Sequence, residues 1–322
     1  MILPDNEEYL SPPVIFEYME KPLVSIVLCT YNGEKFLAEQ IDSILRQSYS
    51  PIELIISDDA STDGTKELLK GYEGNPVIQI HYQEKNIGLT ANFSFVSSKT
   101  KGEFIAFSDQ DDIWLETKIE KLVDAIGDKP LVYSDSLLVD EAGESMNKKL
   151  SDLKRMYSGD DSRGYILYSC VWGHGMLVTK KLLQQCLPMP DQVNHDIWIV
   201  YVAFLNGGIK YIHEVLTYYR QHRQSTSQTL PEKNSIRVKD DRYTDYKKRL
   251  RWIGIMQQHE RENMQPFYLQ LVKLYAAKEK GSYVFPLVGF MLRYRKEIFM
   301  FSKKGFASQL SEIIKQARGE RP

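Results

Sequence analysis

The stretch PLVSIVLCTYNGEKFLAEQIDSILRQS, residues 22–48, joins two patterns that together decide the fold class. Its first part is almost continuously apolar and ends in polar residues, which is typical of a strand buried on both faces. From residue 34 to residue 48, apolar side chains recur with helical spacing, so one face of the helix is apolar. The stretch therefore predicts a buried strand followed by a helix.

The same alternation of strand and helix continues along the first half of the chain. Strands are expected at 52–61, 77–83, 102–109 and 130–140, and helices at 63–73, 88–99 and 113–127. This rhythm indicates an α/β fold with a mainly parallel sheet, right-handed crossovers and flanking helices. From residue 141 on, the regular alternation of strand and helix ends. The remaining segments are a polar stretch at 141–163, an apolar segment at 165–178, a helix near 196–206 and a strand at 208–220.

Charge divides the 322 residues into two parts. The formal net charge is −2, but residues 241–322 hold 17 Lys/Arg against 8 Asp/Glu, which is +9 and leaves −11 for the rest. We expect an N-terminal extension at 1–21, one α/β domain at 22–228 and a basic helical region at 229–322. Such asymmetry points to an anionic partner, either nucleic acid or a membrane surface.

The cysteines and the first residues bear on the cellular compartment. Cys29, Cys170 and Cys186 lie near apolar segments without the spacing of metal ligands, so we expect buried free thiols in a reducing cytoplasm. The first 21 residues are acidic and broken by prolines, unlike a signal peptide. No run of about 18 apolar residues occurs. These features predict a cytoplasmic protein.

An acidic cluster follows the strand expected at 102–109. Asp109, Asp111 and Asp112 lie within four positions in FSDQDDIW. Carboxylates that lie so close together raise one another's pKa unless a cation or hydrogen-bond donors compensate their charge. A divalent metal ion is the simplest way to compensate it. The alternative is that one aspartate caps the next helix while the others are solvated, but a cap explains only one of the three.

The two earlier strands also end in polar residues. Thr30, Tyr31 and Asn32 follow the first strand, and Asp58 and Asp59 follow the second. Ligands of open α/β sheets bind at the carboxyl ends of the strands, so these residues predict a pocket there. A carboxylate can accept hydrogen bonds from a nucleobase and Tyr31 can stack on it. Helix capping is the alternative for Ser61, Thr62 or Asp63, whereas Asp58 and Asp59 come too early to be the cap, and ordinary burial is the alternative for Tyr31.

Four segments together carry a resemblance to a known family: VSIVLCTYNGEKFLAEQIDSILRQSY, ELIISDDASTDGT, EKNIGLTANFS and FSDQDDIW. They resemble the nucleotide-binding half of family 2 glycosyltransferases with the GT-A fold, over about residues 22–140 and more weakly to 228. SDQDDIW, followed by NHDIW and YRQHRQSTS, is most similar to the bacterial rhamnosyltransferase-like branch.

The resemblance implies a metal-dependent, inverting transferase of cell-surface polysaccharide synthesis. The donor would be a dTDP- or UDP-sugar and the acceptor a saccharide or a lipid-linked saccharide, with no role for nucleic acid. Asp111 and His222 would ligate Mg²⁺ or Mn²⁺ on the donor diphosphate, and Arg220 or Arg223 would balance phosphate charge. The residues implied in nucleotide-sugar binding are Thr30, Tyr31, Asn32, Asp58, Asp59, Lys85, Asn86, Asp109 and Gln110.

The resemblance also places a general base at Asp196 in NHDIW. Asp196 matches the second position of the family's Glu-Asp base motif, and His195 stands where glutamate is usual. A carboxylate within reach of the acceptor hydroxyl can take its proton. In the alternative, Asp196 caps its helix and His195 is a surface residue. The residues expected to contact the acceptor are Trp172, His174, His195 and Trp198, with packing in the core the alternative for Trp172.

Two other functions can be weighed from the sequence. Haloacid-dehalogenase-type phosphatases also place Asp-x-Asp after a strand, but normally the first strand, with Thr or Val within two positions. Here Asp112 and Ile113 follow, and three strand–helix units precede. A non-catalytic saccharide-binding homologue is the second alternative, and it predicts loss of Asp111 or Asp196, which are both present.

The segment FPLVGFMLRYRKEIFMFSKKG, residues 285–305, mixes large apolar residues with arginines and lysines. Such a segment can lie in a bilayer interface, so we expect peripheral membrane contact through 284–304. The alternative is an amphipathic helix packed on the catalytic domain or on a second subunit in a homodimer.

Overall fold

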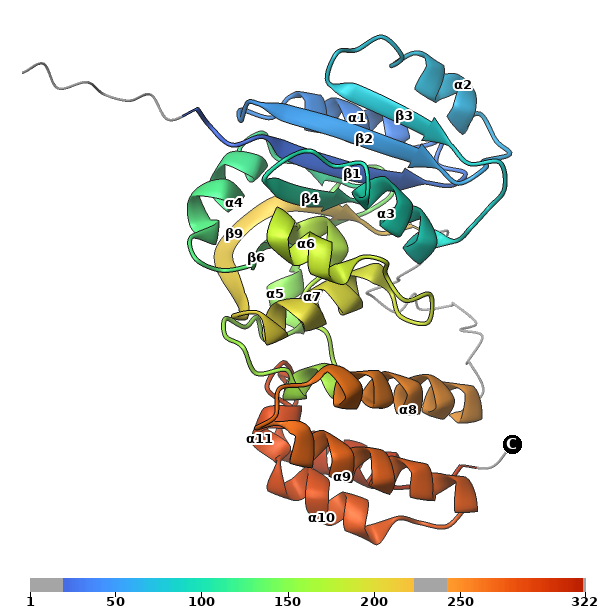
Figure 1. The fold of residues 1–322 in the computed structure, drawn as a ribbon, viewed down its shortest axis with the longest axis vertical. Coiled ribbons are helices and arrows are strands. Elements are labelled where there is room, and N and C mark those ends of the chain that lie inside the picture. The colour runs from blue at the N-terminus through green and yellow to red at the C-terminus, as the bar shows by residue number, and fades with distance from the viewer. Residues whose placement is uncertain (1–19, 223–241, 321–322) are drawn as a thin grey trace, which may run out of the picture.

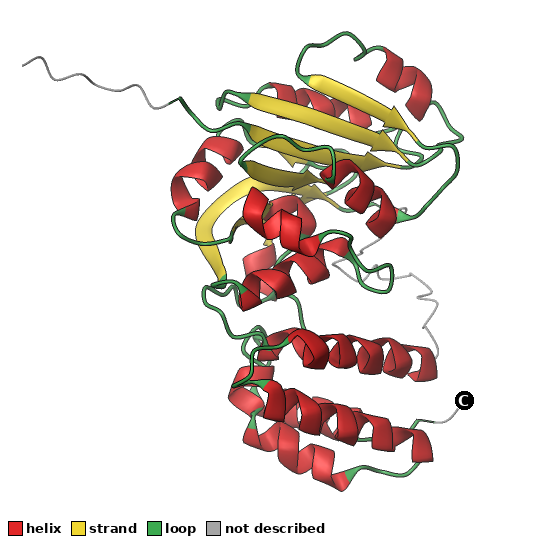
Figure 2. Ribbon diagram, in the orientation of Figure 1, coloured by secondary structure: helices red, strands yellow, loops and turns green. Residues whose placement is uncertain are grey.

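The computed structural model describes residues 20–222 and 242–320. One end of the molecule is a nine-stranded sheet with helices on both faces, and the other end is a layer of helices (Figure 1). Figure 2 shows the strands gathered in the first part and helices alone in the second. The expected α/β class with a helical C-terminal region is confirmed.

The sheet begins as a parallel sheet and becomes mixed. Its order is β3 (Ile78–Tyr82), β2 (Ile52–Asp58), β1 (Val24–Thr30), β4 (Phe104–Ser108), β8 (Met176–Thr179), β6 (Leu131–Val139), β9 (Ile209–Arg220) and β5 (Ile113–Trp114), with β7 (Ser145–Lys149) beside β6. β1 to β4 pair in parallel, as the strand–helix rhythm predicts. β8 then pairs antiparallel with both β4 and β6, while β6 and β9 are parallel.

Apolar side chains on the two faces of the sheet form two cores. On β1, Val24, Ile26 and Leu28 belong to one cluster while Val27 and Cys29 belong to the other, as the alternation of a strand requires. α1 (Leu37–Leu45) and α4 (Lys118–Ile126) cover the first face. α3 (Leu89–Ser97), α6 (Lys180–Cys186) and α7 (His195–Leu205) cover the second. Two short helices, α2 (Thr65–Lys70) and α5 (Leu150–Leu153), complete the domain. The three cysteines are free and buried, as predicted.

The helix expected at 113–127 starts later than predicted. Ile113 and Trp114 form the short strand β5, paired with Tyr218 and Thr217 of β9, and α4 begins only after Thr117. The pairing partner lies about a hundred positions away, where helical spacing gives no hint of it. None of the clustered aspartates is therefore the cap residue of this helix, and that alternative is wrong.

The C-terminal helices pack on the sheet domain. They are α8 (Arg242–His259), α9 (Gln265–Ala276), the 3₁₀ turn Ala277–Lys280, α10 (Phe285–Arg293), α11 (Arg295–Ile298) and α12 (Phe306–Gln316). Most large apolar residues of segment 284–304 are buried, namely Leu287, Phe290, Met291, Ile298, Phe299 and Phe301. These six residues lie in the protein core, as the packed-helix alternative expects, and are not available to a bilayer. Of the described helices, none is both long and apolar enough to span a membrane.

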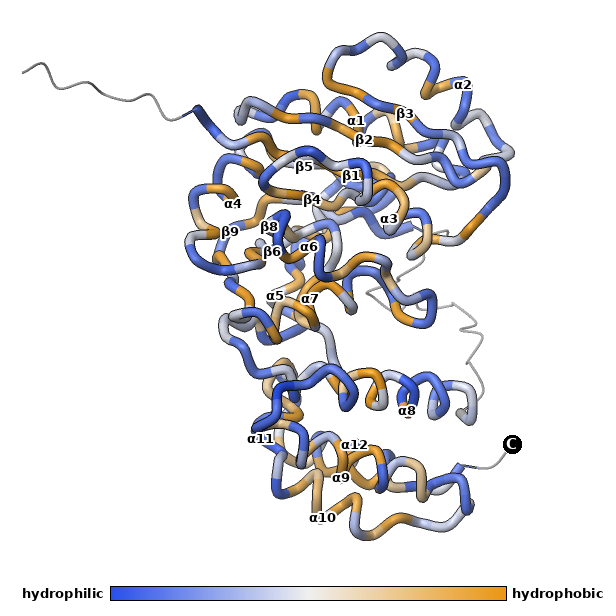
Figure 3. Tube along the Cα trace, viewed as in Figure 1, coloured by the Kyte–Doolittle hydropathy of each residue, from blue (hydrophilic) through white to orange (hydrophobic). Residues whose placement is uncertain are grey.

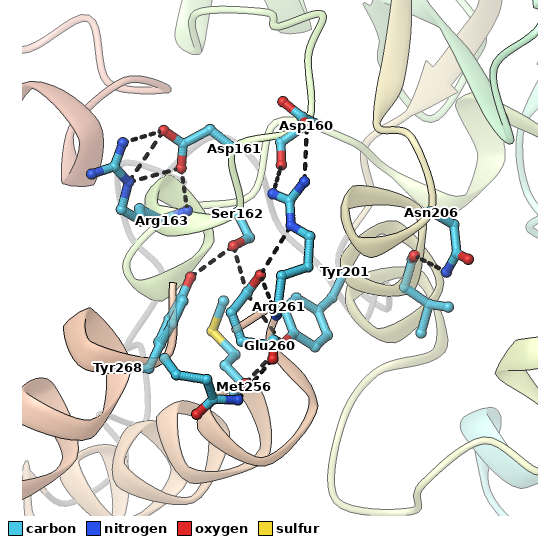
Figure 4. Close-up of polar contacts among 12 residues, drawn as sticks. Asp160, Asp161, Ser162, Arg163, Tyr201, Asn206, Met256, Glu260, Arg261 and Tyr268 are labelled. Carbon is cyan, nitrogen blue, oxygen red and sulfur yellow. Dashed lines mark hydrogen bonds and ion pairs between the residues drawn. The ribbon is translucent and has the colours of Figure 1, made fainter. Parts of the chain in front are cut away.

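A buried carboxylate helps to join the two parts of the molecule. Glu260, which follows α8, is 5% exposed and accepts hydrogen bonds from Ser162 Oγ at 2.8 Å and from the Tyr201 hydroxyl at 3.3 Å (Figure 4). Ser162 Oγ also lies 2.9 Å from the hydroxyl of Tyr268 on α9. Buried polar groups need such partners to avoid a desolvation penalty. The network therefore fixes α8 and α9 against α7 and against the segment that follows α5.

Candidate active site

The polar residues predicted to form a pocket lie along one edge of the sheet. In the parallel pairing, Thr30 of β1 is beside Asp58 of β2, and Leu28 is beside Ser108 of β4. The arrowheads of β1 and β2 in Figure 1 point to that edge. Because the strands end together, the loops that follow them are neighbours.

Gln110 links the loop after β4 to the end of β1. Its Oε1 accepts hydrogen bonds from Thr30 Oγ1 at 2.7 Å and from the Tyr31 N–H at 2.9 Å, and its Nε2 donates to the Tyr31 carbonyl at 3.3 Å. Tyr31 itself is 44% exposed. Because the N–H and the carbonyl of Tyr31 are both hydrogen-bonded to Gln110, the backbone there is fixed. The exposed Tyr31 ring therefore offers a stacking face in a defined position.

Asn32 joins the loops after β1 and β2. Its φ is +50°, in the left-handed region that asparagine tolerates. Its N–H donates to Ser61 Oγ at 2.8 Å, and its Oδ1 accepts the Thr62 N–H at 2.8 Å. Asp58 is fully buried and accepts the Ser61 N–H through Oδ2, while its Oδ1 has no hydrogen-bond partner among the described residues. These contacts set the shape of the loops.

Asp59 holds the loop that carries Lys85 and Asn86. Its two carboxylate oxygens accept the N–H groups of Ile87 and Gly88 at 2.8 and 2.9 Å, and the side chain is nearly buried. Lys85 and Asn86 are exposed on this loop. The structure therefore assigns Asp59 a positioning contact, which leaves the exposed pair accessible to a ligand.

The two residues expected to bind metal are in direct contact. His222 Nε2 lies 2.7 Å from Asp111 Oδ2, which joins the loop after β4 to the residues after β9. Both side chains are largely buried, at 15% exposure for Asp111 and 7% for His222. The His222 ring also packs on Phe36 with centroids 4.8 Å apart. A carboxylate oxygen and an imidazole nitrogen, 111 positions apart in the chain, thus meet at one point.

A second cluster lies beside this pair. Nδ1 of His174 is 3.5 Å from Oδ2 of Asp109 and 3.5 Å from Oδ2 of Asp112, and ligand atoms of the three residues lie within 4.8 Å of one another. Burial, with the help of neighbouring carboxylates, raises the pKa of Asp112 to about 7 although His174 acts against it. Burial also acts to raise the pKa of Asp109, but contact with His174 outweighs it and lowers that pKa. We expected His174 at the acceptor, and the structure places it among the acidic residues.

Lys118 is a buried cation that no pattern in the sequence singles out. Its Nζ donates to the His174 carbonyl at 2.6 Å and to Thr217 Oγ1 at 2.8 Å, and it lies 3.6 Å from the centroid of the Trp114 ring. Burial lowers the pKa of Lys118, while the charges of the nearby aspartates oppose that shift. In sequence it is one of several charged residues at the start of a helix, so nothing marks it as inward-facing.

Arg220 supports the acidic loop, and the structure corrects the role expected for it. It is 2% exposed, and its Nε donates to the Asp111 carbonyl at 2.9 Å. Its two other nitrogens donate to the Glu141 carbonyl at 2.8 Å and to Glu39 Oε2 at 2.5 Å. A guanidinium occupied in this way is not free to bind phosphate. Arg223, the other candidate, lies outside the described residues.

Asp196 lies in the first turn of α7, half-buried. The cap position belongs to Asn194, and Asp196 Oδ1 accepts the N–H of Ile197 at 2.8 Å. Burial raises the pKa of Asp196; the nearby charge of Asp109 adds to the rise, while His195 opposes it. A Cβ on Gly173, the residue before His174, would lie 3.5 Å from Asp196 Cβ, so the expected base lies close to the backbone beside His174.

His195 is a core residue, so the surface alternative is wrong. It is 4% exposed and stacks on Phe93 with ring centroids 3.8 Å apart, and burial lowers its pKa. Neither ring nitrogen has a hydrogen-bond partner in the described structure. A Cβ on Gly173 would lie 2.9 Å from His195 Nε2 and 3.5 Å from Asp196 Cβ. Glycine therefore allows the backbone next to His174 to approach these two residues closely.

The two tryptophans expected at the acceptor differ. Trp198 is 8% exposed and its indole N–H donates to the Cys186 carbonyl at 2.9 Å, so it is a core residue with no free face for a sugar. Trp172 is half-buried and packs on the small cluster formed by Leu138, Leu150 and Tyr219. Of the two, only Trp172 keeps an accessible surface.

Comparison with known proteins places this arrangement in a family. The model of glycosyl transferase family 2 matches residues 25–187. TuaG of Bacillus subtilis, a glycosyltransferase assigned to teichuronic acid biosynthesis, is 35% identical over 115 residues, which are 35% of this chain and 46% of TuaG. The match thus spans less than half the length of that relative.

Solved structures share the fold at low identity. Staphylococcus aureus TarS, residues 1–349 in complex with UDP-GlcNAc, has a TM-score of 0.57 at 16% identity, covering 91% of this chain and 81% of that one. The mannosyltransferase PcManGT of Pyrobaculum calidifontis, in complex with GDP-Man and Mn²⁺, has a TM-score of 0.54 at 15% identity, covering 93% and 86%. At such identities the likeness concerns the fold.

Proposed function

Because the chain belongs to glycosyl transferase family 2, we propose that it transfers a sugar from a nucleoside diphosphate to a saccharide or lipid-linked saccharide with inversion. Resemblance to the rhamnosyltransferase-like branch favours a dTDP- or UDP-sugar, with rhamnose the first to test. Cell-surface polysaccharide is the proposed product class, in keeping with the assignment of TuaG. The observation that carries the proposal is the contact between Asp111 and His222 at the carboxyl edge of the sheet.

The residues at that edge fit a divalent metal. Asp111 and His222 offer one oxygen and one nitrogen ligand, and Mg²⁺ or Mn²⁺ commonly takes one or two carboxylates beside the phosphates of its substrate. The neighbouring Asp112 has a fully buried Oδ2 without a hydrogen-bond partner in the described structure, which an added cation would compensate. When bound, the ion would neutralise charge on the departing diphosphate.

The chain's own groups supply binding and proton transfer. Tyr31, fixed by Gln110, would stack on the base, and the exposed Lys85 and Asn86 would lie over the donor. Asp196 would take the proton of the acceptor hydroxyl. Its raised pKa suits this role, since a general base works best with a pKa close to the working pH. Trp172 would contact the acceptor sugar.

The first experiment is a donor-binding assay with and without metal. UDP, dTDP and GDP, free and as sugar conjugates, are titrated into the protein in Mn²⁺ and in EDTA. We expect one nucleotide class to bind in Mn²⁺ only. Asp111→Asn should weaken that binding by about 10–100-fold or more. Loss of a residue that merely hydrogen-bonds to a metal ligand already has an effect of this size, and Asp111 would be a ligand itself.

Asp128→Asn is the matched control, because Asp128 is exposed in the loop after α4. It should bind like the unaltered protein. If no nucleotide binds under any metal condition, the proposal is refuted. If a donor binds but no hydrolysis or transfer occurs with any acceptor, the non-catalytic alternative replaces it.

A further inference from the structure

The outward sides of α10 and α12 expose large apolar residues. On α10, Phe285 is 74% exposed and Leu292 is 41% exposed, and their i, i+7 spacing places them on one side of the helix. On α12, Phe306 is 59% exposed and Ile314 is 41% exposed, with i, i+8 spacing. Figure 3 shows the apolar run of α10 at the end of the molecule far from the sheet. Exposed aromatic residues in such a group mark an interaction surface.

Of these four residues, Phe285, Phe306 and Ile314 border the same seam between two helices. At one end, the Tyr283 ring packs on Phe285 with centroids 4.7 Å apart, and its hydroxyl donates to the Ile314 carbonyl at 3.3 Å. At the other end, Arg295, just after α10, lies over the Phe306 ring at 5.0 Å. The start of α10 therefore meets the end of α12, and the end of α10 meets the start of α12. We call the outward side of this antiparallel pair the α10–α12 face.

Along residues 281–318, which form this face, the exposed charges have one sign, and the exposed Glu279 just before this range is paired with Lys247. The exposed charged residues between 281 and 318 are Arg293, Lys296, Lys303, Lys304, Lys315 and Arg318. The two carboxylates in that range are half-buried and engaged. Glu297 lies 3.6 Å from Arg163, and Glu312 accepts a hydrogen bond from Gln316 at 2.7 Å. Between residues 281 and 318, cations are thus the only exposed charges, although residues 1–240 carry a net −11.

We propose that the α10–α12 face docks on the surface of an anionic lipid bilayer. The four apolar side chains would enter the boundary between headgroups and acyl chains, and the lysines and arginines would meet anionic headgroups. A second copy of this chain fits poorly, because a symmetric contact would set this cationic face against itself. The surface differs from the one expected from sequence, since the other apolar residues of 284–304 face inward.

Sedimentation of the full chain with lipid vesicles tests this proposal. We expect binding to phosphatidylcholine vesicles that contain phosphatidylglycerol, little binding to pure phosphatidylcholine, and weaker binding as salt is added. The double variant Lys296→Gln, Lys315→Gln should lower the partition coefficient about fivefold for each cation removed. The double variant Phe285→Ala, Phe306→Ala should lower it about tenfold for each ring removed.

Two exposed residues of β7, on the other part of the molecule, provide matched controls. Lys148→Gln and Met146→Ala, the latter at a side chain 38% exposed, should leave the partition coefficient unchanged. Melting curves of all variants report whether each one folds. Equal binding to neutral and anionic vesicles, no binding to either, or equal losses in the controls would each overturn the proposal. So would self-association that Phe285→Ala abolishes, because the face would then join two copies of the chain.

Discussion

Asp196 is the residue at which a general base and a structural carboxylate predict different results. Asparagine can accept the Ile197 N–H just as Asp196 Oδ1 does, so Asp196→Asn keeps the contact inside α7. If Asp196 takes the acceptor proton, transfer should fall roughly 10²–10⁴-fold while donor affinity and melting temperature stay near normal. All three quantities are measured on one sample. Near-normal transfer would show that the base lies elsewhere, and loss of donor binding would move Asp196 into the donor site.

His195 gives the stability of the protein a predictable dependence on pH. Burial lowers its pKa below the ordinary value of 6.5, so the unfolded chain takes up the proton first as pH falls. The free energy of unfolding should therefore be retained above pH 6.5 and fall between 6.5 and the lowered pKa, by up to about 1.4 kcal/mol per pH unit.

Urea denaturation at a series of pH values tests this, with His195→Gln as the comparison. The variant should lose less stability than the unaltered protein over that window, whatever its stability at neutral pH. Parallel curves for the two proteins would mean that His195 does not carry the titration.

The sequence predicts the place of a residue well where that residue directly follows a strand, because the ends of parallel strands lie along one edge of the sheet. Asp111 and His222 do meet, but they are 111 positions apart, and it is the family resemblance, not local order, that implies they ligate one metal. Three other features of the site rest on hydrogen bonds between residues 80 to 109 positions apart in the chain. They are the bonds from Thr30 to Gln110, from Lys118 to Thr217 and from Arg220 to Asp111. No spacing rule reaches across such distances. Trp198 was misplaced because tryptophans in cores and in sugar sites look alike in sequence.

At the scale of elements, β9 ends on Arg220, which holds the acidic loop. Arg220→Lys keeps the charge but cannot make the same set of hydrogen bonds to Asp111, Glu141 and Glu39. We expect a loss of about 2–3 kcal/mol in unfolding free energy, from hydrogen bonds to charged groups, with weaker metal-dependent nucleotide binding. Glu39→Gln removes only a partner whose side chain is 52% exposed, so it should cost less than about 1 kcal/mol. Equal losses for the two variants would show that Glu39 alone explains the effect.

The elements that sequence predicted are those with a strong period. The first four parallel strands and their helices were found within a few residues, because buried strands and amphipathic helices leave clear patterns. The sequence predicts helix at Ile113 and Trp114 because a two-residue strand such as β5 has no period of its own. β7, whose residues are all exposed, lies in the stretch expected only to be polar.

At the scale of the molecule, the C-terminal helices belong to the folded core. Phe301 is fully buried and packs on Phe204 and Tyr165 of the sheet domain, while Phe306 is 59% exposed. Phe301→Ala should cost about 3–5 kcal/mol in urea denaturation. Phe306→Ala should change stability by no more than about 0.5 kcal/mol. A small loss for Phe301→Ala would mean that the helical layer folds apart from the sheet.

Sequence indicated the basic helical region but not how it packs. An amphipathic segment has the same pattern whether its apolar side meets a lipid, a second subunit or its own domain. Here the deciding partners are Phe204, Tyr165 and Arg163, which lie far upstream in the chain. A pattern confined to residues 285–305 holds no information about them.

The docking of Phe301 on Phe204 also has a consequence for synthesis. A ribosome adds about 5–20 residues per second, so the 97 positions between the two take roughly 5–20 s to translate. During that time α7 has left the ribosome or is leaving it while the helices that cover it do not yet exist. The nascent chain therefore carries an uncovered aromatic surface of the kind that aggregates unless chaperones cover it.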